Sequence, residues 1–274
     1  MTHGLIVLNQ DRRLEYLYTF LNSKLPILPV KTLEEFKRGV YSNNFKFIIL
    51  PIRGVNDTGY IDGTDIQLTD DILIKLSKKD IYTGLISTFL KPLAEKYHFR
   101  LVSYLTDDFA IKNNYITVEG IIETIVNQSD KAIYGSNVAI LGYGKLGAIC
   151  AKVLNTMKAN VTIVARSDKD RLHASIYDFA VSDYLEFANK ITQYDFIINT
   201  VPSMVLTNNM LEQLNGTETM IIDVSSPPYG LDHQFAKTKE IKVFLLPGIP
   251  GKIAPKTSGF LLGESIYQHI IGGE

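Results

Sequence analysis

The residues with the clearest chemistry in this chain of 274 residues form a glycine-rich turn. Gly142, Gly144 and Gly147 stand between an apolar run over 137–141 and a stretch with one apolar face at helical spacing. A pyrophosphate needs bare backbone at a helix N-terminus, where N–H groups and the helix dipole favour an anion. The first glycine allows the tight turn, the second leaves room for the phosphates, and the third lets the helix approach the strand. The spacing predicts a dinucleotide site that uses Gly142, Tyr143, Gly144, Lys145, Leu146 and Gly147.

The end of the next apolar run, over 161–165, selects between cofactors. This run completes a strand, helix and strand within roughly 30 residues, the setting that gives such a turn its meaning. NAD sites usually offer Asp or Glu about 20 residues past the glycines, but here the run ends in Ala165, Arg166 and Ser167. A guanidinium and a hydroxyl suit a ribose 2′-phosphate, so we predict NADP bound by Arg166 and Ser167. Asp168 keeps NAD as the alternative.

Three further apolar runs, over 195–199, 220–224 and 242–246, are each followed by a loop rich in Pro, Gly or short polar residues. Ligands of parallel α/β sheets bind beyond the carboxyl ends of the strands, so we expect these loops to form the site. Prolines and glycines that only make turns are the alternative. The expected cofactor contacts are Thr200, Val201, Pro202 and Pro247, and the expected substrate contacts are Ser225, Ser226, Lys256 and Thr257.

The N-terminal half also alternates apolar runs, over 5–8, 45–50, 84–87 and 101–104, with amphipathic stretches. The first run is followed by no glycine fingerprint, so this half is interpreted as a substrate or lid domain. We predict an α/β protein with two doubly wound parallel-sheet domains, the C-terminal one a Rossmann dinucleotide-binding domain. The expected parts are the N-terminal domain over 1–115, a connecting helix over 116–134, the Rossmann domain over 135–258 and a C-terminal helix over 259–274.

Candidate acids, bases and clamps are few. Thr117 is expected to cap the connecting helix and to contact substrate, and Glu119 is either a base or a complement to the helix dipole. His233 titrates in the right range for a base, although a lone histidine also suits a surface position. Lys256 and Arg53 are the expected carboxylate clamps, with a solvated surface lysine as the alternative for Lys256. The catalytic candidates are therefore Glu119, His233 and Lys256.

Composition excludes several classes of function. The net charge of −1 leaves no basic field for a nucleic acid or an anionic membrane. Charged residues over 11–15 interrupt the first twenty positions, so we expect no signal peptide, no membrane span and a cytoplasmic location. The single cysteine, Cys150, excludes an intramolecular disulfide and falls on an apolar helix face, which predicts a buried, inert thiol. No metal site is expected.

Four motifs together resemble the A subunit of dipicolinate synthase. They are the turn over 142–147, the strand end over 165–167, the segment over 198–204 and the segment over 247–259, of which the last is the most specific. The resemblance extends upstream through 117–120 and 50–54, and so covers most of the chain.

This family is similar in fold to the 2-hydroxyacid dehydrogenases. The resemblance implies NAD(P)-dependent oxidation of a dihydrodipicolinate-type cyclic dicarboxylate to pyridine-2,6-dicarboxylate during sporulation, together with a flavoprotein-like B subunit. We also expect a homo-oligomer. The alternatives are a 2-hydroxyacid or shikimate-type dehydrogenase, or a non-catalytic nucleotide-binding subunit of a two-subunit synthase.

The chain departs from the family pattern at three places. It has Asn9 and Gln10 where the family has two glycines, Ile116 in place of proline, and Pro227 in place of arginine. Loss of an arginine near a strand end would remove a carboxylate contact, so a related but altered substrate is a further alternative.

Overall fold

The computed structural model describes residues 3–272, whose strands and helices alternate along the chain. The chain divides into two compact units. Unit 1 joins the described residues up to Asn113 to those from Ala254 onward, and unit 2 holds Asn114–Ile253. Each unit contains one parallel sheet, which confirms the predicted fold class. The C-terminal segment belongs to unit 1, whereas the sequence predicts a C-terminal helix separate from both domains.

Within the described residues, the sheet of unit 1 has five parallel strands in the order β2-β1-β3-β4-β5. Since β1 has β2 on one side and β3 on the other, the order reverses between β1 and β3. In doubly wound sheets such a reversal opens a crevice at the carboxyl ends of the two strands. The strands are β1 (His3–Val7), β2 (Ile27–Val30), β3 (Phe45–Ile49), β4 (Asp80–Thr83) and β5 (Arg100–Ser103).

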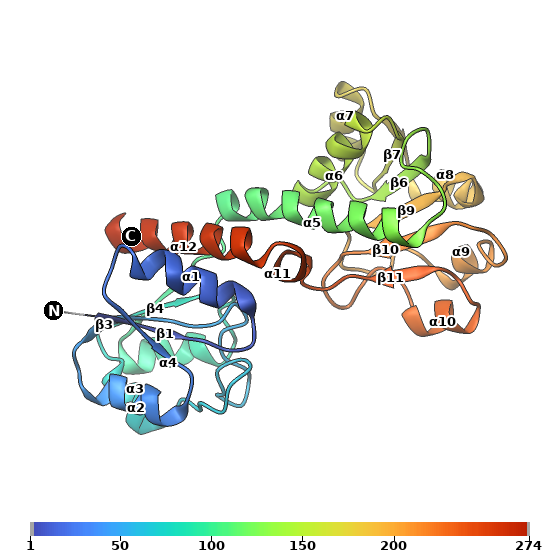
Figure 1. Ribbon diagram of the computed structural model, residues 1–274. Helices are drawn as coiled ribbons and strands as arrows, with labels where there is room; N and C mark the ends of the chain where they lie inside the picture. The colour runs from blue at the N-terminus through green and yellow to red at the C-terminus, as the bar shows by residue number, and fades with distance from the viewer. Residues whose placement is uncertain (1–2, 273–274) are drawn as a thin grey trace. The chain divides into compact units, whose positions relative to one another are not determined.

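Helices cover both faces of this sheet. One face packs against α2 (Leu33–Tyr41), α3 (Asp70–Lys75) and α4 (Leu90–Tyr97). The other packs against α1 (Arg12–Asn22) and α12 (Pro255–Gly272), which lie side by side (Figure 1).

Three details of the prediction are corrected. The strand expected over 84–87 is wrong, because β4 precedes it and Leu85 is exposed. The helix expected over 116–134 is α5 (Asp107–Gln128), which begins earlier because the Thr106 hydroxyl accepts a hydrogen bond from the Phe109 amide at 3.2 Å. Consequently Thr117 does not cap this helix but lies inside it. The C-terminal helix begins at Pro255, and a short helix, α11 (Ile249–Ile253), precedes it in the expected loop.

The sheet of unit 2 has six parallel strands among the described residues, in the order β11-β10-β9-β6-β7-β8. Its order reverses between β6 and β9. The three strands expected in the second half are confirmed as β9, β10 and β11. The strands are β6 (Asn137–Leu141), β7 (Asn160–Val164), β8 (Ala180–Ser182), β9 (Phe196–Asn199), β10 (Met220–Asp223) and β11 (Val243–Leu245).

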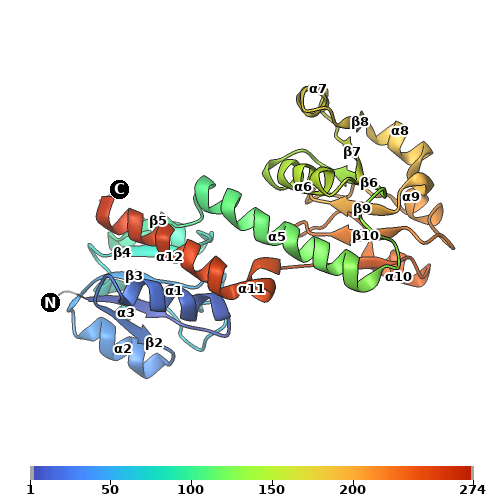
Figure 2. The ribbon, with the colours of Figure 1, turned by 45° about the horizontal axis from the view of Figure 1, so that its top comes forward.

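Two layers of helices bury this second sheet. Residues of α5, α6 (Lys145–Thr156) and α7 (Asp168–Ile176) share a core with one face, where α5 and α6 are seen in Figure 2. Residues of α8 (Tyr184–Asn189), α9 (Asn208–Glu212) and α10 (His233–Thr238) share a core with the other. Over residues 3–272, no helix is both long enough and apolar enough to span a bilayer.

Candidate functional site

The glycine-rich turn lies at the order reversal of unit 2, between β6 and α6. Gly142 has a φ of +93°, a conformation that favours glycine. A Cβ on Gly147 would lie 2.2 Å from the carbonyl oxygen of Gly142, so the third glycine is required for packing. A Cβ on Gly144 would meet nothing within 4 Å, and α6 starts there without a side-chain cap. The turn thus leaves an open cradle at a helix N-terminus, which fits a dinucleotide pyrophosphate.

The register of the strands places the predicted loops at the same edge of the sheet as this turn. Leu141 pairs with Asn199, and Asn199 pairs with Asp223 on the next strand. The Thr200 hydroxyl donates to the Leu141 carbonyl at 2.8 Å, which fixes the loop after β9 against β6. The carboxyl ends of β6, β9 and β10 therefore form one continuous edge.

A pocket of about 280 Å³ opens at this edge, within unit 2. It collects residues from the turn, from α5 and from the three loops that follow β9, β10 and β11. No residue of its lining carries a charge. Predicted site residues that line it are Thr117, Leu146, Thr200, Pro202, Ser225 and Ser226, with Gly248 next to Pro247.

Asp223, at the end of β10, organises the loops around the pocket. Its carboxylate is fully buried. One oxygen, Oδ1, accepts hydrogen bonds from Asn199 Nδ2 at 2.8 Å and from the Ser225 hydroxyl at 2.7 Å. The other, Oδ2, accepts from the Gly230 amide at 3.2 Å and lies 3.0 Å from His233 Nε2. One buried acceptor therefore connects the loops after β9 and β10 with the start of α10.

The sequence analysis missed Asp223. The sequence shows only an acidic residue at the end of an apolar strand. No spacing motif links this residue to its hydrogen-bond partners. The Asp223 carboxylate and the Asn199 amide together fix the loop after β9. Asn199 bonds to Asp223 and also exchanges hydrogen bonds with the backbone of Val201 at 3.1 Å.

The two predicted bases differ in their surroundings. His233 is half-buried, and its ring contacts both Asp223 and the edge of Tyr229, with ring centroids 5.6 Å apart. A buried carboxylate in this position orients an imidazole ring. Glu119 is exposed on α5. Neither belongs to the lining of the 280 Å³ pocket.

The tip of β7 carries the residues predicted to select the cofactor. Arg166 is exposed. Its positive charge acts to lower the pKa of Tyr184, but burial of that side chain outweighs the charge and raises the pKa to about 12. Ser167 caps α7 by accepting from the Asp170 amide at 3.4 Å. Asp168 is paired with Arg171, which also donates to the carbonyl of Arg166 at 2.9 Å. The carboxylate that favoured NAD thus forms an ion pair with a neighbouring guanidinium, while its own side chain stays exposed.

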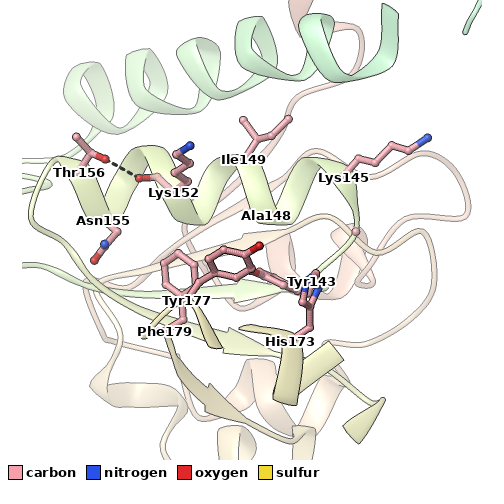
Figure 3. Close-up of a pocket in the computed structure, with 11 residues that line it drawn as sticks. Tyr143, Lys145, Ala148, Ile149, Lys152, Asn155, Thr156, His173, Tyr177 and Phe179 are labelled. Carbon is pink, nitrogen blue, oxygen red and sulfur yellow. Dashed lines mark hydrogen bonds between the residues drawn. The ribbon is translucent and has the colours of Figure 1, made fainter. Parts of the chain in front are cut away.

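A larger groove, of about 740 Å³, runs beside the same turn along α6 (Figure 3). Aromatic rings line one side of it. Tyr143 meets His173 and Phe179 edge-on, with ring centroids 5.8 and 6.4 Å apart. Because the ring of Tyr143 is packed in this cluster, we expect its backbone, and not its ring, to face the cofactor. The side chain of Lys145 extends away from the rings.

The remaining predicted residues lie in unit 1. Arg53 is exposed and follows β3 by a short turn. Lys256 and Thr257 are exposed in the first turn of α12, where the ammonium of Lys256 lies 5.9 Å from the centre of the Phe260 ring. Cys150 is buried in α6, which confirms the predicted burial, and burial raises the pKa of its thiol to about 12.

The departure at Asn9 has a structural explanation. Its side chain accepts from the Asp11 amide at 2.8 Å and donates to the Asp62 carbonyl at 2.9 Å. Asn9 therefore ties the loop after β1 to the loop that follows β3. Ile116 is buried within α5, and Pro227 is exposed in the loop after β10.

The parallel sheet of unit 2, with its glycine turn and level strand ends, defines a nicotinamide dinucleotide-binding domain of the dehydrogenase type. Residues 114–215 match the model for the D-isomer specific 2-hydroxyacid dehydrogenase NAD binding domain, and residues 26–105 match the N-terminal domain of the dipicolinate synthase A subunit. The chain belongs to the family of dipicolinate synthase A subunits.

Two dipicolinate synthase A subunits illustrate this membership, and a third protein matches over a short segment. The dipicolinate synthase A subunit of Bacillus subtilis (strain 168) is 32% identical over 229 residues, which cover 81% of this chain and 76% of that protein. The crystal structure of the dipicolinate synthase A subunit from Bacillus halodurans has a TM-score of 0.85 at 29% identity, and the match covers 97% of each chain. NADP-dependent alcohol dehydrogenase C 1 of Mycolicibacterium smegmatis is 39% identical over 72 residues, which are 24% of this chain and 20% of that protein.

Proposed function

We propose that this chain is an oxidoreductase of the dipicolinate synthase A type. In this proposal it oxidises a dihydrodipicolinate-type cyclic dicarboxylate to pyridine-2,6-dicarboxylate with NADP. Membership of the family supports the reaction class. The observation that carries the proposal is the small pocket beside the glycine turn, because its lining offers an uncharged space at the place where a nicotinamide ring would sit.

A dicarboxylate needs cations, and unit 1 supplies the candidates. The pocket in unit 2 has no charged lining residue, so it cannot by itself neutralise two carboxylates. Arg53 and Lys256 are exposed cations in unit 1, and Thr257 adds a hydroxyl. We therefore assign dinucleotide binding to unit 2 and carboxylate binding to unit 1.

Two observations support NADP over NAD. Arg166 is exposed at the tip of β7, and Asp168 beside it is ion-paired with Arg171. A guanidinium suits a 2′-phosphate, whereas a ribose 2′-hydroxyl is normally bound by a carboxylate that is available to it. The short match to an NADP-dependent alcohol dehydrogenase agrees with this choice.

The reaction requires hydride removal and proton removal from the same dihydro ring. The nicotinamide supplies the hydride acceptor when it is bound. The proton passes to a base of the protein, and the product ring gains aromaticity. Of the two candidates, His233 is the better supported, because the Asp223 carboxylate 3.0 Å from Nε2 orients its ring. Glu119 is the alternative.

The wider setting follows from the family. We propose a cytoplasmic protein that acts in sporulation, assembles as a homo-oligomer and works beside a flavoprotein-like B subunit. Nothing in its charge or its described helices favours a nucleic acid or a membrane as partner.

The decisive experiment is turnover by the purified chain. The dihydro substrate is generated in situ, and the absorbances of reduced nicotinamide and of pyridine-2,6-dicarboxylate are followed with NADP or NAD, with and without the B subunit. We expect product with NADP, and a strong loss of turnover in Lys256→Ala. Product formation by the chain alone would exclude a purely nucleotide-binding role. Turnover of simple 2-hydroxyacids in place of the cyclic substrate would favour the dehydrogenase alternative, and an unaffected Lys256→Ala variant would remove Lys256 from the site.

A further inference from the structure

Arg13 is a cation that the sequence analysis did not assign to the site. It occupies the second position of α1, two residues after the N-cap Asp11. Its side chain is only 16% exposed. Cations at a helix N-terminus face the positive end of the helix dipole and are destabilising there. Residues that break a local rule in this way are often retained for function.

The guanidinium of Arg13 is held along one edge only. Its Nε donates to Asp11 Oδ1 at 2.9 Å, and its Nη2 donates to Asp11 Oδ2 at 2.6 Å. Among the described residues, none accepts a hydrogen bond from Nη1. A planar guanidinium can hold a carboxylate on each of two edges, so the side-on contact with Asp11 leaves the edge formed by Nη1 and Nη2 for a second carboxylate.

Arg13 lies beyond the carboxyl end of β1, at the point where the strand order of unit 1 reverses and where doubly wound sheets commonly have a crevice. Asp11 and Arg13 follow β1, and Leu50 and Arg53 follow β3. The hydroxyl of the buried Tyr104 donates to the Leu50 carbonyl at 2.9 Å, and the positive charge of Arg13 acts to lower the pKa of this phenol, which burial raises. Crevices of this kind are the usual ligand sites of doubly wound sheets.

The packing of α1 against α12 brings the predicted clamp Lys256 to the same end of unit 1. A Cβ on Gly259 would lie 2.4 Å from the Arg13 carbonyl, and a Cβ on Gly263, one turn later in α12, would lie 2.6 Å from the ring of Phe20, further along α1. The two helices therefore run parallel, and their N-termini lie together. Lys256 precedes Gly259 by one turn. Arg13 and Lys256 thus stand in the first turns of neighbouring helices, and Arg53 follows β3, the strand that pairs with β1.

We propose that Arg13 is a carboxylate-binding residue, which grips one carboxylate of a small planar dicarboxylate through its Nη1 and Nη2 edge while Asp11 fixes the plane of the guanidinium. The inference rests on the proposed function, which requires cations for two carboxylates. It adds a residue and a geometry: Arg13 supplies the directional contact, and Arg53 and Lys256 supply charge.

Calorimetric titration with pyridine-2,6-dicarboxylate tests this proposal. We expect Arg13→Lys to weaken binding by about tenfold, since a lysine keeps the charge but loses the two-pronged contact. Arg12→Lys, on the exposed neighbour, is the matched control and should bind like the wild type. Asp11→Asn discriminates further. Asparagine still caps α1 but removes a negative charge. If the dicarboxylate is attracted only by net charge, this variant should bind it more tightly. If Asp11 fixes the orientation of the guanidinium, binding should be several-fold weaker.

The outcomes separate the inference from the proposed function. Thermal unfolding of each variant first establishes that it is folded. If wild-type protein binds the dicarboxylate and Lys256→Ala weakens it, but Arg13→Lys does not, the assignment of Arg13 is wrong and the proposed function stands. Equal or tighter binding by Asp11→Asn would overturn the orienting role of Asp11. If the wild type binds no dicarboxylate with or without NADP, the proposed function itself fails.

Discussion

Asn199 Nδ2 donates a hydrogen bond of 2.8 Å to Asp223 Oδ1 across two neighbouring strand ends of unit 2. The two residues are also partners in the register of β9 and β10. Side chain and backbone therefore hold the same pair together. Since the loops that follow these residues contribute Thr200, Ser225 and Ser226 to the pocket, the geometry of the pocket depends on this contact.

Asp223→Leu should destabilise unit 2 by about 3 kcal/mol, because it leaves the Asn199 amide, the Gly230 N–H and His233 without their buried acceptor. Urea unfolding followed by circular dichroism measures the change. Asp232→Asn is the control, since Asp232 caps α10 nearby and asparagine caps equally well. A loss of similar size in both variants would contradict the role assigned to Asp223.

Gly144→Ala and Gly147→Ala make the same chemical change with opposite expected results. The Cβ at residue 144 points into open space, so the fold should lose no more than about 1 kcal/mol. NADP binding should fall at least about tenfold, because the methyl group occupies the phosphate cradle.

At residue 147 the Cβ meets the Gly142 carbonyl oxygen at 2.2 Å, so the fold should lose about 2 kcal/mol or more. Thermal unfolding and NADP titration on both variants distinguish the two effects. A Gly144→Ala protein that binds NADP normally would show that the pyrophosphate lies elsewhere.

Arg166→Ala should weaken NADP binding by about tenfold or more, the expected loss of charge-assisted hydrogen bonds to a 2′-phosphate. Affinity for NAD should change little, because NAD lacks that phosphate. Fluorescence titration with both dinucleotides gives the ratio directly. Lys169→Ala, which removes an exposed cation from the adjoining helix α7, serves as control. Equal losses for NADP and NAD would assign Arg166 to general electrostatic attraction.

The pH dependence of stability in unit 2 should include a contribution from Asp195. Burial acts to raise the pKa of this carboxyl, but hydrogen bonds from Lys131 Nζ and from the Asn137 amide, each 2.8 Å long, outweigh it and lower the pKa below 3.8. A lowered folded-state pKa stabilises the fold above the unfolded value, and this contribution is lost as the pH falls through the folded value.

Asp195→Asn should therefore cost about 1 kcal/mol near neutral pH, and the difference from wild type should shrink below pH 3.8. Urea unfolding at a series of pH values measures it. Glu218→Gln, which changes the exposed second partner of Lys131, should have little effect at any pH. A difference that persists unchanged into acid would contradict the assignment.

The sequence predicts features whose determining residues are close together in the chain, and it does not predict features that depend on distant residues. The glycine turn and the strands on either side were predicted because their determinants lie within a short stretch of chain. Asp223 was missed because its partners are distant: Asn199 is 24 residues away and His233 is 10 residues away. Arg13 was not among the candidates because its place at the order reversal depends on the strand order of unit 1, which no local pattern encodes.

Helix boundaries show the same limit. The start of α5 was placed too late because Thr117 and Glu119 resemble a cap, yet Thr106 with Asp107 and Asp108 forms the real one. The N-terminus of α12 was also placed too late, since the prolines over 247–255 suggested a loop. In the structure Pro255 occupies the first helical position, where proline is favoured.

The membership of α12 in unit 1 also governs the order in which the protein assembles during synthesis. Leu262 and Ile266 complete the core that contains Leu14 and Leu17, so the part of the chain made first finishes folding last. Unit 2 emerges whole before α12 leaves the ribosome. Until then, the part of this apolar core that Leu262 and Ile266 cover in the finished protein stays exposed, and transiently exposed apolar surface of this kind is what chaperones bind.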